Sequence, residues 1–192
     1  DPSPKVDALI EIWEERGGRP FAACAEHRQL IDLAALRFDK LKISYGRITG
    51  GQQPWERDQT LRDFQGGKLD VLLFTLKAGG TGLTMTAADL IVFLQRSWSM
   101  IDNRQAEDRV HRIGSEVHES IQVVHLIAQG TVEDTQVERL IEKSLRLDEI
   151  TRDRKKLAEA GLGNTEVYLG LSIAELDLEA EQILQSNLGD PL

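Results

Sequence analysis

The stretch VLLFTLKAGGTGLTMTAADLIVFL, residues 71–94, decides the fold of this chain. It contains two continuous apolar runs, Val71 to Phe74 and Leu90 to Leu94, joined by a segment rich in glycine. Apolar runs without polar alternation are typical of strands that are buried on both faces, as in a parallel sheet covered by helices. We therefore expect both runs to be strands of such a sheet.

The segments on either side of this stretch alternate between helix-like and strand-like patterns. Apolar residues at helical spacing predict helices over residues 6–15, 26–38, 54–65 and 132–147. Short apolar runs predict further strands over residues 20–25, 43–48 and 121–128. Repeated strand–helix units imply an α/β fold, with helices on both faces of a parallel sheet. We assign this fold to residues 1–150, and expect an acidic helical extension over residues 151–192, with a last helix at 172–184.

Composition is that of a water-soluble globular domain. The 192 residues are 41% hydrophobic and 29% charged, and no apolar run approaches the roughly 18 residues that a membrane span needs. A single cysteine, Cys24, excludes an internal disulfide and a cysteine-based metal cluster, and we expect it to be a buried core thiol. The four histidines show no metal-ligand spacing.

The net charge of −9 is placed unevenly along the chain. From Leu157 to the end there are seven acidic residues and no Lys or Arg, which leaves −2 for the first 156 residues. A nearly neutral body can still present a local basic surface to nucleic acid, because the patch counts and not the sum. The acidic tail is a possible protein-binding segment.

The ten residues QAEDRVHRIG, 105–114, carry the clearest chemical signal. In a helix, Gln105, Arg109 and Arg112 lie at i, i+4 and i+7 on one polar stripe, and the residue after each of them is apolar. Two arginines on one rigid edge suit a phosphate, because each guanidinium is always charged and offers a planar fork of donors. Spacing alone leaves open the alternative of a solvated, charged helix face.

The glycine-rich segment Thr75 to Leu83 follows an apolar strand and precedes a short helix. Such a turn exposes backbone N–H groups and can bind an anion at a helix N-terminus. The chain has no G-x-x-x-x-G-K-[ST] phosphate loop and no acidic magnesium box. It therefore lacks the sequence elements that hold ATP and Mg²⁺ in phosphoryl-transfer enzymes.

The motif QAEDRVHRIG closely resembles motif VI of superfamily-two helicases, in the form found in SWI/SNF-type DNA translocases. Three further blocks are similar to the same family in the right order. Residues 45–64 (YGRITGGQQPWERDQTLRDF) resemble the strand, turn and Arg-bearing helix that precede motif V. Residues 71–93 resemble motif V itself, and Ser97-Trp98 resembles the aromatic element that follows it. The resemblance runs from about Lys5 to Glu138 and implies one RecA-like lobe, the C-terminal one of two.

The resemblance implies nucleotide contacts at five positions. Arg109 and Arg112 would be arginine fingers that approach the γ-phosphate of ATP. Gly80 and Gly82 would border the nucleotide, and Gln105 would link it to the DNA side. ATP and Mg²⁺ would be held mainly by a preceding lobe, so we expect this chain to be inactive by itself.

The resemblance also implies DNA contacts. These fall on residues around the strand ends: Arg47, Gly50, Thr75, Lys77 and Trp98. Two structural alternatives remain open at this point. The basic residues of the earlier block could form buried ion pairs, for instance Arg57 with Asp70 or Glu56, and Trp98 could be a core tryptophan under a loop. The chain also departs from the family pattern after Trp98, where Ser99-Met100 replaces Asn-Pro, and at Ser115, where Gln is usual.

The sequence thus predicts the second motor lobe of an ATP-dependent, double-stranded-DNA translocase. Its expected partners are duplex DNA and an N-terminal RecA-like lobe of the same polypeptide, with no membrane. The expected location is the nucleus in a eukaryote, and the cytoplasm or nucleoid in a prokaryote or phage. Two alternatives remain: a lobe of an RNA helicase or strand-separating DNA helicase, and a non-catalytic module that binds nucleic acid or a partner protein.

Overall fold

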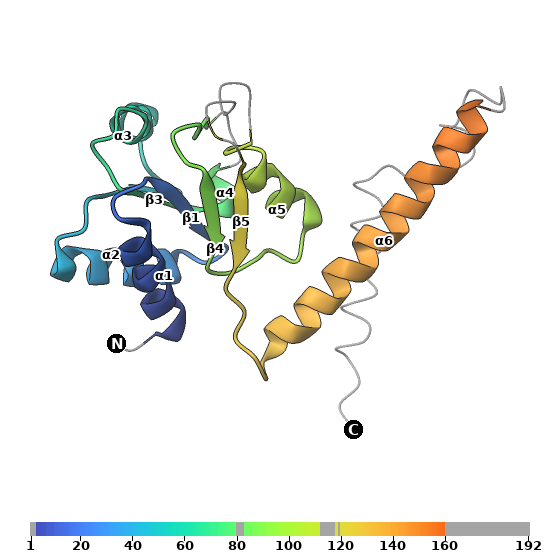
Figure 1. The fold of residues 1–192 in the computed structure, drawn as a ribbon, viewed down its shortest axis with the longest axis horizontal. Helices are drawn as coiled ribbons and strands as arrows, with labels where there is room; N and C mark the ends of the chain where they lie inside the picture. Colours follow the sequence, from blue (N-terminus) through green and yellow to red (C-terminus); the bar gives the residue numbers. More distant parts are fainter. Residues whose placement is uncertain (1–2, 80–82, 112–117, 119, 160–192) are drawn as a thin grey trace. The chain divides into compact units, whose positions relative to one another are not determined.

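A computed structural model describes residues 3–79, 83–111, 118 and 120–159 of the chain. Two compact units divide between Glu138 and Arg139, inside the last described helix. Figure 1 draws this helix in orange. The first unit carries all the strands of the described chain. The predicted boundary at residue 150 and the predicted helix at 172–184 stay predictions, and the latter lies outside the described residues.

One parallel sheet forms the centre of the first unit. Its strands are β1 (Phe21–Ala25), β2 (Tyr45–Ile48), β3 (Val71–Thr75), β4 (Leu90–Phe93) and β5 (Gln122–His125). They lie in the order β2-β3-β1-β4-β5, and every neighbouring pair is parallel. The expected α/β fold is confirmed, and each predicted apolar run overlaps one strand of this sheet.

Helices connect the strands. Their bounds are α1 (Pro4–Arg16), α2 (Arg28–Leu41), α3 (Pro54–Gln65), α4 (Leu76–Gly79), α5 (Met100–Glu107) and α6 (Val132–Glu159). Local signals explain several ends. Gly17 ends α1 in the left-handed region, at φ 59°. The Gln53 backbone N–H donates to Glu56 Oε2 at 3.0 Å, which caps the start of α3.

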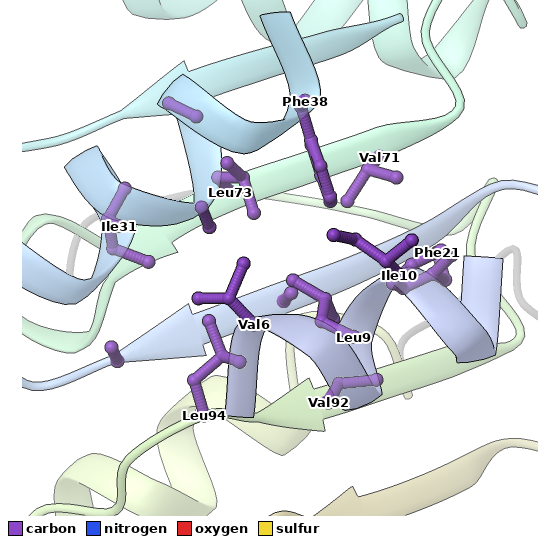
Figure 2. Packing of buried hydrophobic residues seen from close by; sticks show 14 of the residues in the cluster. Val6, Leu9, Ile10, Phe21, Ile31, Phe38, Val71, Leu73, Val92 and Leu94 are labelled. Atoms are coloured by element: carbon purple, nitrogen blue, oxygen red, sulfur yellow. The ribbon is translucent and has the colours of Figure 1, made fainter. Parts of the chain in front are cut away.

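Alternate residues of the inner strands face opposite sides, and each side has its own core. On one side, α1 and α2 cover Phe21, Leu73 and Val92, as Figure 2 shows. On the other side, Leu72 and Ile91 pack with residues of α3, α4 and α5. Burial of both faces explains why the inner strands β1, β3 and β4 are runs of mostly apolar residues. The fully buried Cys24 belongs to the second core, which confirms the prediction of a core thiol.

The structure corrects two predicted elements. The short helix expected after the glycine-rich segment Thr75 to Leu83 lies inside that segment, as α4, and residues 83–89 contain no helix. The helix expected over residues 105–114 begins earlier, at Met100, and ends at Glu107. Its start is capped by Ser99, whose Oγ accepts from the Asp102 backbone N–H at 3.2 Å. Arg109 therefore lies in the turn that follows α5 and not in the helix. None of the described helices is both long enough and apolar enough to cross a membrane.

Candidate functional site

The candidate residues for DNA contact lie at or just after the carboxyl ends of the strands, where ligands bind in open parallel sheets. Arg47 lies in β2 and Gly50 in the turn after it. Thr75 is the last residue of β3, and Lys77 follows it in α4. Trp98 lies in the loop between β4 and α5. The sheet thus places residues from distant parts of the sequence along one edge.

One side chain fixes the backbone of the turn after β2 by two hydrogen bonds. Gln52 Oε1 accepts from the Thr49 backbone N–H at 2.8 Å, and Gln52 Nε2 donates to the Arg47 carbonyl at 3.0 Å. Gly51 occupies the left-handed region at φ 88°, whereas the exposed Gly50 does not. A Cβ at Gly50 would meet no atom within 4 Å, so neither backbone strain nor internal packing requires glycine there. The turn presents a bare backbone to the outside.

Arg47 takes part in an ion pair inside the lobe. Its Nη1 lies 2.7 Å from Asp32 Oδ1 of α2, and the Arg47 side chain is 40% exposed. Asp32 also forms an ion pair with Arg28, whose Nε lies 3.3 Å from Asp32 Oδ2. The charge of Arg47 is therefore already partly balanced, and a phosphate would compete with Asp32 for it. Sequence reasoning missed Asp32, because α2 and β2 come together only in the fold.

Arg57 supports the glycine-rich segment from α3. Its Nη2 donates to the Ala78 carbonyl of α4 at 2.5 Å. Glu56, one of the two partners considered from sequence, caps α3 instead. The basic block thus braces the segment that leads into Gly80. Gly80 and Gly82 themselves lie outside the described residues.

Residue Arg109 is tied to the segment that follows the glycine-rich turn. The Met85 backbone N–H donates to the Arg109 carbonyl at 2.9 Å, and Arg109 Nη1 donates to the Leu83 carbonyl at 3.3 Å. Leu83 and Met85 are both buried in the second core, so this connection is anchored. The structure therefore brings the motif V and motif VI segments into direct contact.

The end of α5 has the apolar anchor that the sequence predicted. Ala106 and Val110 are buried in the second core, while Gln105 is exposed and Arg109 is half-buried. Arg112 lies outside the described residues, so the spacing of the two arginines stays a prediction. Both Val110 and His111 donate their backbone N–H groups to the Glu107 carbonyl, at 3.1 and 3.0 Å.

Trp98 is neither a core residue nor a fully exposed one. The flanking loop is held by a reciprocal pair of hydrogen bonds: Ser97 N–H to Asn103 Oδ1 at 2.9 Å, and Asn103 Nδ2 to the Ser97 carbonyl at 2.8 Å. Both Ser97 and Asn103 are buried. Trp98 is half-buried beside this hydrogen-bonded pair, and its predicted DNA contact stays a prediction. Lys77 is exposed and Thr75 is buried.

Sequence analysis assigned no functional role to three ionisable residues in or near α5: Arg96, Glu107 and His125. Burial, helped by the positive charge of Arg96, lowers the pKa of His125 to about 4. Burial raises the pKa of Glu107, and the charge of Asp108 adds to this, while Arg96 and Arg104 oppose it. Burial lowers the pKa of Arg96, and the negative charge of Glu107 counteracts that effect. A cluster with such shifts at the carboxyl edge of a sheet is a candidate for function.

Metal ligands do not gather anywhere in the described part of the chain. Among those residues, no three His, Cys, Asp or Glu side chains form a group that could hold a metal ion. The site is therefore built from guanidinium groups, backbone N–H groups and a few polar side chains.

Comparison with known proteins gives the family. Residues 4–114 match the model of the helicase conserved C-terminal domain. The chain is 33% identical over 141 residues to the chromatin-remodeling ATPase INO80 of Homo sapiens, which covers 72% of this chain and 9% of that protein. It is 32% identical over 164 residues to the ATP-dependent helicase fft2 of Schizosaccharomyces pombe, with 83% and 12% covered. The chain thus spans about a tenth of the length of these relatives.

Solved structures agree on the fold. The C-terminal part of the Fun30 ATPase domain superposes with a TM-score of 0.67 at 22% identity, over 72% of this chain and 45% of that one. The Hef helicase domain of Pyrococcus furiosus gives a TM-score of 0.55 at 27% identity, over 69% and 27% of the two chains. The sheet and its helices are therefore those of a RecA-like helicase lobe, which confirms the predicted fold class. The chain belongs to the family of helicase conserved C-terminal domains, as a lobe of the SWI/SNF type.

Proposed function

We propose that this chain is the second motor lobe of an ATP-dependent, double-stranded-DNA translocase or remodeller. The observation that carries the proposal is the pair of hydrogen bonds that joins Arg109 to Leu83 and Met85. This contact couples the arginine segment to the glycine-rich turn, so a change at the nucleotide would reach the strand ends that face DNA. The relatives named as a chromatin-remodeling ATPase and an ATP-dependent helicase support this function.

On the nucleotide side, Arg109 and Arg112 would approach the γ-phosphate of ATP when this lobe closes on its partner lobe. ATP would supply the phosphoryl group, and Mg²⁺ would neutralise the charge of the phosphates. The described part of this chain holds no cluster of metal ligands, and we assign the binding of ATP and Mg²⁺ mainly to the other lobe. Gly80, Gly82 and Gln105 would line the nucleotide. An arginine finger is typically worth about 10³- to 10⁵-fold in turnover.

On the DNA side, the exposed turn at Gly50 and the exposed amine of Lys77 would contact the phosphate backbone. Thr75 and Trp98 would lie beside the tracked strand, and Arg47 would exchange its partner Asp32 for a phosphate. Contacts of this kind carry no sequence information and weaken as salt rises. Opening and closing with each ATP would then move the lobe along the duplex.

A second candidate function is a lobe of a strand-separating or RNA helicase. The likeness to the Pyrococcus furiosus Hef helicase domain favours it, because that protein is named a helicase. The relative named a chromatin-remodeling ATPase favours the remodeller instead, and it supports a nuclear location in a eukaryotic cell. In a prokaryote or phage the location would be the cytoplasm or nucleoid. A protein partner of the acidic tail at residues 157–192 remains part of the proposal.

The test is ATP hydrolysis by the full-length protein with duplex DNA, single-stranded DNA or RNA as the stimulating nucleic acid. We expect strong stimulation by duplex DNA, lost in Arg112→Ala and kept in Arg62→Ala, which removes an exposed arginine of α3. Stimulation by RNA or single strands alone would assign the chain to another helicase class. No hydrolysis under any condition would favour a binding module.

A further inference from the structure

The segment Thr84–Ala87 leads from the glycine-rich turn toward β4 and contains neither helix nor strand. Backbone N–H and C=O groups in such a segment need partners outside regular secondary structure. The side chains of Leu83 and Met85 are buried in the second core, whereas Thr84, Thr86 and Ala87 are only partly buried. Hydrogen bonds from other elements therefore decide where this backbone runs.

One glutamine of α3 binds the segment at both of its ends. Gln65, the last residue of α3, donates from Nε2 to the Thr84 carbonyl at 2.8 Å and to Thr86 Oγ1 at 3.2 Å. Its Oε1 accepts from the Ala87 backbone N–H at 2.8 Å. A side-chain amide carries both donors and an acceptor, so Gln65 pairs with the segment as a neighbouring peptide group would.

The middle of the same segment holds Arg109. The Met85 backbone N–H donates to the Arg109 carbonyl at 2.9 Å, and Arg109 Nη1 donates to the Leu83 carbonyl at 3.3 Å. Met85 lies between the two backbone groups that Gln65 binds, so a shift of the segment would move Arg109 with it. A short path of hydrogen bonds and peptide bonds thus leads from the end of α3 to Arg109.

The helix α3 is itself fixed near both ends. Phe64, which precedes Gln65, is fully buried in the second core. Near the start of the helix, Arg57 Nη2 donates to the Ala78 carbonyl of α4 at 2.5 Å. The helix therefore braces the chain before and after the glycine-rich turn. Because α3 also follows the exposed turn at Gly50, it links that turn to the segment that holds Arg109.

We propose that Gln65 is a positioning residue that sets the orientation of Arg109 toward the nucleotide. It clamps the Thr84–Ala87 segment to α3, and Met85 passes the position of this clamp to Arg109. Gln65 is exposed, and water is an alternative partner for its amide, so its hydrogen bonds add only modest net stability. Their main effect is a fixed backbone position. This inference rests on the proposed ATPase function.

Gln65→Met is the direct test, because methionine has a similar length and lacks the amide. In the full-length protein we expect kcat for DNA-stimulated ATP hydrolysis to fall by about tenfold to 10²-fold, the usual effect of a small misplacement of a catalytic group. KM for ATP should stay within about twofold, since the lost interaction acts in the transition state. Gln59→Met is the matched control, because the amide of this exposed glutamine bonds to Arg62 and Asp63 of the same helix. It should leave kcat unchanged, and both variants should have nearly the same urea midpoint.

A double variant separates action through Arg109 from a general loosening of the lobe. Gln65→Met combined with Arg109→Ala should keep the residual turnover of Arg109→Ala, because groups that act as a unit are not additive. A further loss in the double variant, unchanged kcat in Gln65→Met, or a loss of kcat together with a lower urea midpoint than in Gln59→Met would each overturn the inference. Arg109→Ala alone distinguishes the two levels. Full turnover in Arg109→Ala would contradict the proposed function, whereas reduced turnover there beside a fully active Gln65→Met would contradict this inference alone.

Discussion

Replacing Gly46 by alanine should destabilise the lobe, whereas the same change at Gly50 should not. Gly46 lies in the edge strand β2, and a Cβ there would lie 2.5 Å from Thr60 Cγ2 and 2.8 Å from Leu69 Cδ1. Carbon atoms in contact prefer a separation of about 3.5–4.0 Å, so both neighbours would have to move by about 1 Å. Thr60 resists such a shift, because its hydroxyl donates to the Glu56 carbonyl at 2.9 Å and its β-branched side chain has few rotamers.

Overpacking of this size typically costs about 1–3 kcal/mol, and we expect Gly46→Ala to lower the free energy of unfolding by that amount. Urea denaturation of the chain measures it as a lower midpoint at an unchanged slope. Thr60→Ser removes the closest methyl group and should recover part of the loss. A Gly46→Ala chain as stable as the original would refute the packing argument.

Gly50→Ala is the control at a glycine that has no packing neighbour. Because its Cβ would meet nothing within 4 Å and its φ is not in the left-handed region, stability should change by less than about 0.5 kcal/mol. Affinity of the full-length protein for duplex DNA should nevertheless fall, since the added methyl occupies the surface that the phosphate backbone would approach. A loss of stability equal to that of Gly46→Ala, or unaltered DNA affinity, would contradict this interpretation of the turn.

Three further predictions follow from other contacts. Lys5 Nζ lies 2.5 Å from Glu133 Oε1, and both side chains are less than 20% exposed. Lys5→Met leaves the Glu133 carboxylate buried without its partner and should therefore lower the free energy of unfolding by about 2–4 kcal/mol. The double variant Lys5→Met, Glu133→Gln should lose less, because no unpaired charge remains. The pKa of His125 in the folded chain lies below its unfolded value of about 6.5, so the unfolded chain binds the proton first as the pH falls. The free energy of unfolding should therefore fall by at most about 3 kcal/mol as the pH drops from about 6.5 to about 4. His125→Phe should flatten this part of the pH profile. Lys77→Ala should weaken duplex-DNA binding at every sequence and reduce the slope of log affinity against log salt by about 1.

The sheet could be predicted from sequence because its signal is local. Each inner strand is a run of consecutive apolar residues, and the alternation within β1 and β3 supplies both cores. The start of α5 also had a local signal that was not used, since Ser99 is followed three residues later by Asp102, which completes an N-terminal cap. The apolar stripe of residues 105–114 was read correctly at Ala106 and Val110, although the helix ends before Arg109.

The electrostatic part of the site could not be predicted in the same way. Asp32 meets Arg47 because α2 lies over β2, and the sequence gives no measure of that distance. Arg96 and His125 come together because β4 and β5 are neighbours in the sheet. Pairs of this kind depend on the topology of the fold. A sequence motif therefore identifies arginines such as Arg47, but not the groups that lie beside them in the structure.

The most direct test of the central claim separates ATP turnover from DNA binding in one set of proteins. Full-length wild type, Arg109→Ala and Arg112→Ala should be compared for DNA-stimulated ATP hydrolysis and, in parallel, for affinity to duplex DNA. The account predicts a loss of turnover of about 10³-fold or more in Arg112→Ala, with DNA affinity nearly unchanged. An equal loss of DNA affinity, or turnover within a few-fold of wild type, would show that these arginines do not act at the nucleotide.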